Sequence, residues 1–158
     1  MKTAVFAGSF CPVTKGHVNV IERAAKLAER LIVVIPININ KNYIISLADR
    51  ERLLARAAKH ISNVAVMTTG RALVDFCKEQ KADFIIKSVR NPFDLQYETD
   101  MADINYEIGG IETVFLAADK RYSTVSSTYV RELAAFGQDI SRYVPDGLDK
   151  EISRLLKP

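Results

Sequence analysis

The chain has 158 residues and a mass of 17.7 kDa, close to the size of one ordinary domain, so we expect a single domain over residues 1–158. Hydrophobic residues make up 48% of the chain and charged residues 26%, a balance that excludes global disorder. The 22 Lys and Arg residues outnumber the 19 Asp and Glu residues only slightly, which argues against a nucleic-acid-binding surface. This mildly basic chain suits small anionic ligands better.

The cysteines and the N-terminal segment bear on the cellular compartment. Cys11 and Cys77 lie far apart, with neither the CxxC spacing nor the nearby histidines of a zinc site, and they suggest no disulfide framework. The apolar run in MKTAVFAGSF is too short for a signal peptide, and no window of about 18 apolar residues could cross a membrane. We therefore expect a cytoplasmic protein without a membrane partner.

Five short apolar runs alternate with six helical patterns along the chain. We expect strands at residues 3–7, 31–35, 64–68, 84–86 and 113–116. We expect helices at residues 16–30, 46–60, 72–81, 94–107, 127–136 and 146–156, the second of them capped by Ser46. Strands with almost no polar side belong in a parallel sheet that is covered on both faces. The predicted fold class is therefore α/β, a single doubly wound (Rossmann-like) domain with a five-stranded parallel sheet and helices on both faces.

The segment after the first predicted strand reads GSFCP at residues 8–12 and leads into a helix that begins near His17. In doubly wound sheets, ligands bind outside the carboxyl ends of the strands. Gly8 lets the backbone approach a ligand closely, Ser9 offers a hydroxyl, and His17 lies where the free N–H groups of a helix attract anions. We expect a phosphate site here, although the segment has neither the P-loop nor the GxGxxG pattern.

These residues resemble a known family. The sequence TKGH at residues 14–17 resembles the TxGH motif of the (H/T)xGH nucleotidyltransferases, and GSFCP resembles the turn before it in the pantetheine-phosphate adenylyltransferases. A GH pair alone would more often be an ordinary turn, but the ten-residue context favours the functional interpretation. Thr14 favours these enzymes over relatives that adenylate nicotinamide or nicotinate mononucleotide, which usually have His there. The resemblance implies adenylyl transfer from ATP to 4′-phosphopantetheine, giving 3′-dephospho-coenzyme A and pyrophosphate in coenzyme A biosynthesis.

Three later segments and one lysine also match the family. Lys41, in the loop after the second strand, matches the lysine that reaches the reacting phosphates. The sequence IKSVRN at residues 86–91 resembles the IRGLR segment, with Lys87 in place of its first arginine. DLQYE at residues 94–98 resembles DFEYE, and YSTVSSTYVRE at residues 122–132 resembles SxISSSxVKE. Hydroxyl groups that open a helix suit the β- and γ-phosphates of a nucleotide.

The resemblance implies a role for each matching residue. The residues implied in catalysis are His17 and Lys41. The residues implied in binding the acceptor are Ser9, Lys41, Leu73, Lys87 and Asn105. The residues implied in binding the nucleotide are Ser9, Phe10, His17, Arg90, Glu98, Ser126, Ser127 and Thr128. Met101 matches a position against the pantetheine arm, but plain core packing at four-residue spacing from Tyr97 explains it equally well.

The implied reaction needs no general base, because the acceptor phosphate is already an anion at neutral pH. Catalysis then consists of positioning and charge stabilisation. We expect Mg²⁺ on the leaving pyrophosphate, without a dedicated set of metal-ligating residues. The resemblance also implies a homo-oligomer, a hexamer in this family, and leaves feedback binding of coenzyme A open.

Two alternatives stay open. The first is another nucleotidyltransferase of the same fold with nicotinamide mononucleotide, nicotinate mononucleotide or glycerol phosphate as acceptor. The RTxG sequence typical of cytidylyl transfer is missing before Ser126, which favours adenylyl transfer. The second is a nucleotide-binding module without catalysis, supported only by the departures from the family at Cys11, where Asp is usual, and at Lys87. The presence of His17 and Lys41 argues against this second alternative.

Overall fold

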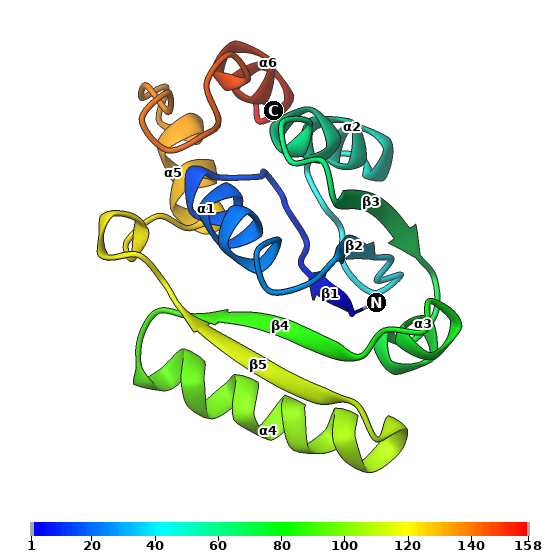
Figure 1. Cartoon of the computed structure of the whole chain (residues 1–158). Helices are drawn as coiled ribbons and strands as arrows, with labels where there is room; N and C mark the ends of the chain where they lie inside the picture. The colour runs from blue at the N-terminus through cyan, green and yellow to red at the C-terminus, as the bar shows by residue number, and fades with distance from the viewer. Residues whose placement is uncertain (1, 158) are drawn as a thin grey trace.

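Five strands form one parallel sheet in the computed structural model, which describes residues 2–157 (Figure 1). The strands are β1 (Thr3–Ala7), β2 (Arg30–Pro36), β3 (Val64–Thr69), β4 (Phe84–Val89) and β5 (Glu112–Ala117). Their order across the sheet is β3-β2-β1-β4-β5, and all neighbouring pairs are parallel. Because the chain crosses from one side of β1 to the other between β3 and β4, the strand order reverses at β1 and β4. Ligand sites of such sheets lie at the carboxyl edge of this reversal.

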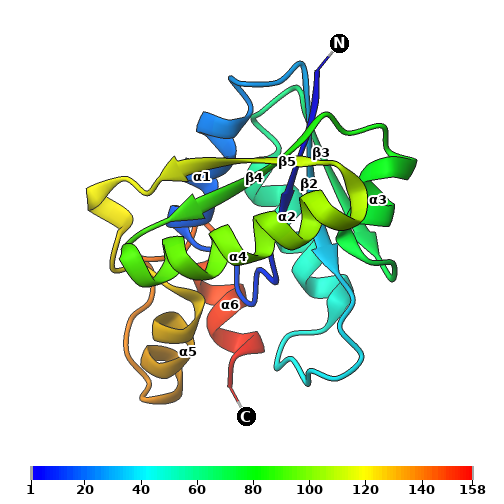
Figure 2. The same ribbon diagram turned by 90° about the horizontal axis from the view of Figure 1, so that it is seen from below.

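Helices cover both faces of the sheet. They are α1 (Lys15–Ala24), α2 (Leu47–Ala58), α3 (Leu73–Glu79), α4 (Pro92–Gly109), α5 (Ser127–Ala135) and α6 (Asp149–Leu155), with a short 3₁₀ helix, η1, at Lys120–Tyr122. Figure 1 shows α1, α2, α5 and α6 on one face and α3 and α4 on the other. Figure 2, seen from below, shows α4 lying across β4 and β5. This arrangement confirms the predicted doubly wound α/β fold.

Alternating side chains of the strands supply two hydrophobic cores. In β1, Ala4 and Phe6 pack into the core beneath α1, α2, α5 and α6, whereas Val5 packs into the core beneath α3. All three side chains are at most 5% exposed. Burial on both faces explains why the strands have near-continuous apolar sequences. None of the helices in residues 2–157 combines the length and apolar character needed to span a bilayer.

The first helix is shorter than its sequence pattern predicts. The pattern predicts a helix over residues 16–30, but α1 ends at Ala24. The side-chain amide of Asn63, just before β3, donates hydrogen bonds to the carbonyl oxygens of Ala25 and Ala28. The Ala25 carbonyl is one that a helix continuing to residue 30 would have satisfied internally, and the Ala28 carbonyl is one that it would have left free. The helix end is therefore set by a residue far away in the sequence.

The fourth strand is longer than predicted. The sequence predicts residues 84–86, but β4 continues to Val89 in register with β5. Lys87 and Ser88 therefore lie within the strand rather than in the loop after it, which corrects the sequence-based placement. The side chain of Lys87 reaches the carboxyl-edge cavity described below, where a polar group is tolerated. The remaining predicted boundaries differ from the observed ones by three residues or fewer.

Candidate active site

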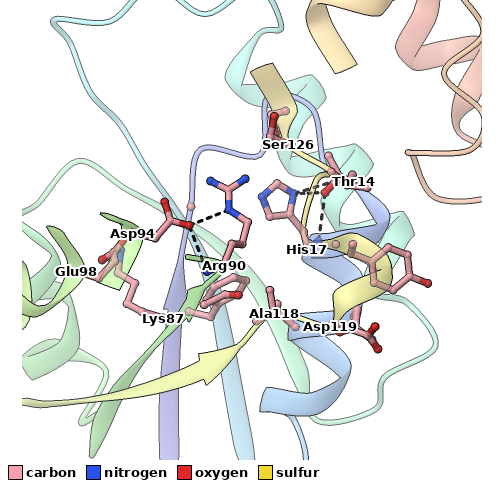
Figure 3. Close-up of a pocket in the computed structure, with 18 of the residues that line it drawn as sticks. Thr14, His17, Lys87, Arg90, Asp94, Glu98, Ala118, Asp119 and Ser126 are labelled. Carbon is pink, nitrogen blue, oxygen red and sulfur yellow. Dashed lines mark hydrogen bonds and ion pairs between the residues drawn. The ribbon is translucent and has the colours of Figure 1, made fainter. Parts of the chain in front are cut away.

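A cavity of about 320 Å³ opens at the carboxyl edge of the sheet, where β1 and β4 are neighbours. Its walls come from the ends of β1, β4 and β5 and from the N-terminal parts of α1, α4 and α5 (Figure 3). The fold thus brings together segments that are more than a hundred residues apart in the chain. The predicted site residues that line this cavity are His17, Lys87, Arg90, Glu98, Ser126, Ser127 and Thr128.

Thr14 and His17 form a reciprocal cap at the start of α1. The Thr14 hydroxyl accepts a hydrogen bond from the backbone N–H of His17 at 3.2 Å, and Nδ1 of His17 accepts one from the backbone N–H of Thr14 at 3.0 Å. A ring nitrogen that accepts an N–H carries no proton itself, so neutral His17 has its proton on Nε2. This second ring nitrogen faces the guanidinium of Arg90 in Figure 3. His17 is therefore oriented as a hydrogen-bond donor toward the cavity.

The charge state of His17 follows from its surroundings. Burial lowers the pKa of His17 from 6.5 to about 4, and the positive charge of Arg90 adds to the effect. The imidazole is thus neutral at pH 7. A neutral Nε2–H can still donate to a phosphate oxygen, and a bound anion would raise the pKa of the ring again.

Arg90 follows the end of β4 and is oriented by Asp94 in the first turn of α4. Its Nε donates to Oδ2 of Asp94 at 2.9 Å, and its backbone N–H also reaches this oxygen. Asn91 caps α4 by accepting the backbone N–H of Asp94 at 2.9 Å. With Nε engaged, the guanidinium tip is presented to the cavity (Figure 3). A fixed guanidinium is well suited to phosphate oxygens.

Lys87 and Glu98 form an ion pair that sequence reasoning missed. Nζ of Lys87 lies 3.2 Å from Oε2 of Glu98, and both side chains are about one-fifth exposed. The same carboxylate oxygen lacks a partner with hydrogen-bond geometry among the described residues, so the contact is one of charge and distance alone. The sequence assigned Lys87 to the acceptor and Glu98 to the nucleotide. The structure places the two opposite charges against each other, and the roles of these residues toward the substrates stay predictions.

The three hydroxyl residues at the start of α5 differ in what they contact. The Ser126 hydroxyl caps the helix by accepting the backbone N–H of Tyr129 at 3.0 Å. The Ser127 hydroxyl donates to the carbonyl oxygen of Pro12 at 2.7 Å and so joins α5 to the loop after β1. Thr128 accepts from Arg131 at 3.2 Å. The N-terminus of α5 with these hydroxyls forms one wall of the cavity, where its free N–H groups favour anions.

Ser9 and Phe10 are not among the residues that line the cavity, although both were predicted to bind the nucleotide. The Ser9 hydroxyl lies 3.4 Å from the hydroxyl of Tyr43 on the loop after β2. Phe10 is 2% exposed and packs edge-on against His17, with ring centroids 4.9 Å apart. Phe10 therefore contacts the imidazole from within the core, and direct binding by Ser9 and Phe10 stays a prediction.

The remaining predicted site residues also lie outside the cavity lining. Lys41 is exposed on the loop between β2 and α2. Leu73 is the first residue of α3, and Asn105 is a buried residue of α4, on the other face of the sheet. Met101 on α4 is partly buried. The roles of these residues toward the acceptor stay predictions.

Asp119, Asn19 and Tyr122 line the cavity but were not singled out from the sequence. Asp119 caps η1, and its hydrogen bonds from Arg121 lower the pKa of its carboxyl to about 2. Oδ1 of Asn19 is buried without a hydrogen-bond partner among the described residues. Asp119 immediately before a helical turn was a readable N-cap signal. No local sequence pattern marks Asn19, which reaches the cavity only because α1 packs where it does.

The acidic side chains that line the cavity lie against basic ones. Among residues 2–157, no three His, Cys, Asp or Glu side chains converge in a way that could hold a metal ion. The carboxylates of Asp94 and Glu98 are already engaged by Arg90 and Lys87. The two cysteines are buried and unpaired, and burial raises the pKa of the Cys77 thiol to about 11. The Cys77 side chain is part of the core beneath α3.

Comparison with known proteins identifies the family. The cytidylyltransferase-like family model matches residues 5–133. The chain is 42% identical over 155 residues to a phosphopantetheine adenylyltransferase of Clostridium botulinum, covering 98% of this chain and 94% of the relative. It is 39% identical over 152 residues to the enzyme of the same name from Thermobifida fusca, covering 96% and 93% of the two chains.

Solved structures share the fold at lower sequence identity. A putative nicotinate-nucleotide adenylyltransferase from Vibrio parahaemolyticus is 21% identical, with a TM-score of 0.65 and 99% of each chain covered. A bifunctional NMN adenylyltransferase/ADP ribose pyrophosphatase from Francisella tularensis is 14% identical, with a TM-score of 0.68. That match covers 98% of this chain and 51% of the longer one. From its sequence relatives and its fold, the chain belongs to the cytidylyltransferase-like nucleotidyltransferases and, within them, to the phosphopantetheine adenylyltransferase family.

Proposed function

We propose that this chain transfers the adenylyl group of ATP to 4′-phosphopantetheine, giving 3′-dephospho-coenzyme A and pyrophosphate. The observation that carries the proposal is the Nε2–H of neutral His17, which faces the guanidinium of Arg90 across a cavity at the β1–β4 reversal (Figure 3). Relatives that are 39–42% identical over nearly the whole chain are named for this reaction, which supports the choice of acceptor.

The chemistry is a direct displacement at the α-phosphorus of ATP. A phosphate oxygen of 4′-phosphopantetheine forms the new bond to the α-phosphorus, and the bond from this phosphorus to the oxygen bridging the β-phosphate breaks. The electron pair of the broken bond leaves with pyrophosphate, and no proton has to be removed from the attacking oxygen. The protein therefore has to align the two phosphates and stabilise the negative charge that builds up between them.

The residues divide this work between the two substrates. His17 would donate a hydrogen bond from Nε2 to the α-phosphate. Lys41, on its exposed loop, would close over the reacting phosphates. Arg90, Glu98 and the N-terminus of α5 would hold ATP, as the motifs of the family imply. Ser9 and Lys87, with Leu73 and Asn105, would hold the acceptor. The paired state of Lys87 and Glu98 means that the acceptor phosphate has to share the Lys87 ammonium with a carboxylate.

Mg²⁺ enters this proposal as part of the MgATP substrate. Mg²⁺ keeps several waters and is bound mainly by substrate phosphates in such sites, so we expect phosphate oxygens and water to hold this ion. When bound, the ion neutralises charge on the leaving pyrophosphate. Activity should therefore require added Mg²⁺ and disappear in excess EDTA.

The test is the release of pyrophosphate from ATP with each candidate acceptor in turn. Turnover with 4′-phosphopantetheine, and none with nicotinamide mononucleotide, nicotinate mononucleotide or glycerol phosphate, is the expected result. Preference for one of the other acceptors would assign the chain to a different reaction of the same fold. ATP binding without pyrophosphate release from any acceptor would indicate a binding module without catalysis.

Assembly into a homo-oligomer, a hexamer as the family resemblance implies, forms a further part of the proposal. Helix α4 supports it, because its large apolar side chains are poorly covered within the chain: Phe93 is 87% exposed, Tyr97 64%, Tyr106 55% and Ile108 64%. Exposed apolar surface of this extent is typical of an interface. Light scattering after size-exclusion chromatography should give a mass near six chains, and Ile108→Glu should lower it.

Regulation and location complete the proposal. Coenzyme A, which retains the product's nucleotide and pantetheine parts, would compete for the same cavity and act as a feedback inhibitor. Inhibition kinetics with coenzyme A test this directly, and competition with 4′-phosphopantetheine is the expected pattern.

A cytoplasmic location fits the two unpaired cysteines and can be checked by fractionation of the source cells.

A further inference from the structure

Arg50 joins the loop after β1 to the loop after β2. It lies in the first turn of α2 and is 4% exposed. Its Nη1 donates a hydrogen bond to the carbonyl oxygen of Ser9 at 2.9 Å, and its guanidinium lies over the ring of Tyr43, 4.0 Å from the ring centre. The Nε of the same side chain is buried without a hydrogen-bond partner among the described residues.

Among the described residues 2–157, the charge of Arg50 has no carboxylate partner. None of the ion pairs formed within residues 2–157 includes it, whereas Arg52 and Arg56 on the same helix both pair with Glu151. The Ser9 carbonyl and the Tyr43 ring compensate the charge only in part, because neither is an anion. A buried cation without a counter-ion is unfavourable. An anion that binds nearby would therefore be favoured.

The two loops that Arg50 joins carry residues predicted to contact the acceptor phosphate. Ser9 follows β1, and Lys41 follows the neighbouring strand β2. Tyr43 lies two residues after Lys41, and its hydroxyl is 3.4 Å from the Ser9 hydroxyl. The stack of Arg50 on Tyr43 is thus the contact that brings the lysine loop next to Ser9.

We propose that Arg50 is a positioning residue for the phosphomonoester end of the acceptor, with Tyr43 as the partner that sets its place. Arg50 fixes the carbonyl of Ser9 and so the direction of the Ser9 hydroxyl. Tyr43 holds the Lys41 loop beside it, and the uncompensated guanidinium adds positive potential where the phosphate binds. This inference rests on the proposed function, because it takes 4′-phosphopantetheine as the acceptor.

The experiment measures binding and turnover separately. Isothermal titration calorimetry gives the Kd for 4′-phosphopantetheine, and pyrophosphate release gives the KM for each substrate. Arg50→Met removes the charge at similar length, Tyr43→Leu removes the aromatic ring, and Tyr43→Phe keeps the ring without its hydroxyl. Arg56→Met serves as the matched control, since Arg56 lies on the same helix, exposed and outside the site.

Arg50→Met loses the charge-assisted hydrogen bond to the Ser9 carbonyl. This variant should bind the acceptor at least about 10-fold more weakly than the parental chain, with the KM for ATP changed less than about 2-fold. The Kd of Tyr43→Leu for the acceptor should lie between the values for Arg50→Met and the parental chain. Tyr43→Phe and Arg56→Met should have the parental Kd. If Arg50→Met does not fold, the two Tyr43 variants test the inference. Equal acceptor binding by Tyr43→Leu and the parental chain overturns it.

Other outcomes separate this inference from the proposed function. A parental chain that binds 4′-phosphopantetheine without releasing pyrophosphate would overturn the proposed function and leave the positioning role intact, provided that Arg50→Met still weakens binding. A folded Arg50→Met that changes the KM for ATP and for the acceptor alike would reduce Arg50 to a general structural role. A parental chain that does not bind 4′-phosphopantetheine overturns both.

Discussion

The free energy of unfolding of the parental chain should fall at mildly acid pH, and replacing His17 by glutamine should remove this fall. Glutamine does not titrate, and as the third residue of α1 it can accept the backbone N–H of Thr14 as His17 does, which completes a capping box. The helix start is therefore kept while the titrating group is removed.

The magnitude follows from the pKa of His17, which burial and Arg90 lower to about 4 in the folded chain, against 6.5 when unfolded. Between these two pH values the unfolded chain binds a proton that the folded chain does not, so the free energy of unfolding falls as the pH falls. The slope is about 1.4 kcal/mol per pH unit, which amounts to about 2 kcal/mol between pH 6.5 and pH 5. The ring lines the cavity and keeps some exposure to solvent, so this value is an upper bound.

Urea unfolding followed by circular dichroism at pH 7.5 and pH 5, in buffers without phosphate, measures the effect. The parental chain should lose up to about 2 kcal/mol more than His17→Gln between the two conditions. His60→Gln is the control, because it removes the other histidine, whose contact with Glu22 lies outside the cavity, and the loss that depends on His17 should persist in it. An equal loss in the parental chain and His17→Gln would refute the buried, neutral state of His17.

Three predictions concern turnover. His17→Ala should lower kcat by about 10²–10⁴-fold while ATP still binds, because it removes a donor aimed at the developing charge; a near-parental kcat would contradict this role. Lys41→Ala should also act mainly on kcat, and a change confined to the KM for ATP would reassign Lys41 to ground-state binding. Lys87→Ala should lower kcat/KM for 4′-phosphopantetheine by about 10–150-fold, whereas Lys87→Arg should lower the KM, because a guanidinium can contact Glu98 and the phosphate together. Steady-state kinetics with each substrate varied in turn checks all three, and an effect of Lys87→Ala on ATP alone would place Lys87 at the nucleotide.

Local signals in the sequence were enough for most of the elements and for several residues that line the cavity. The apolar run of β1 was bounded correctly at residues 3–7, because a strand covered on both faces has to be apolar throughout. Ser46 and Ser126 cap α2 and α5 through their own hydroxyls, contacts that span three residues and can be read from a short window. The rule that ligands bind at the carboxyl ends of strands placed His17 and Arg90 together at one edge.

Contacts between distant segments decided the rest. Asn63 determines where α1 ends, and the pairing of β4 with β5 places Lys87 inside a strand. The pairing of Lys87 with Glu98 depends on α4 packing across β4, which no local pattern encodes. The low pKa of His17 likewise arises from burial and from Arg90, which follows β4 and is far from His17 in the sequence. The sequence by itself determined the elements and several of the groups that reach the edge of the sheet, whereas their partners and charge states depend on distances that only the packed helices and strands define.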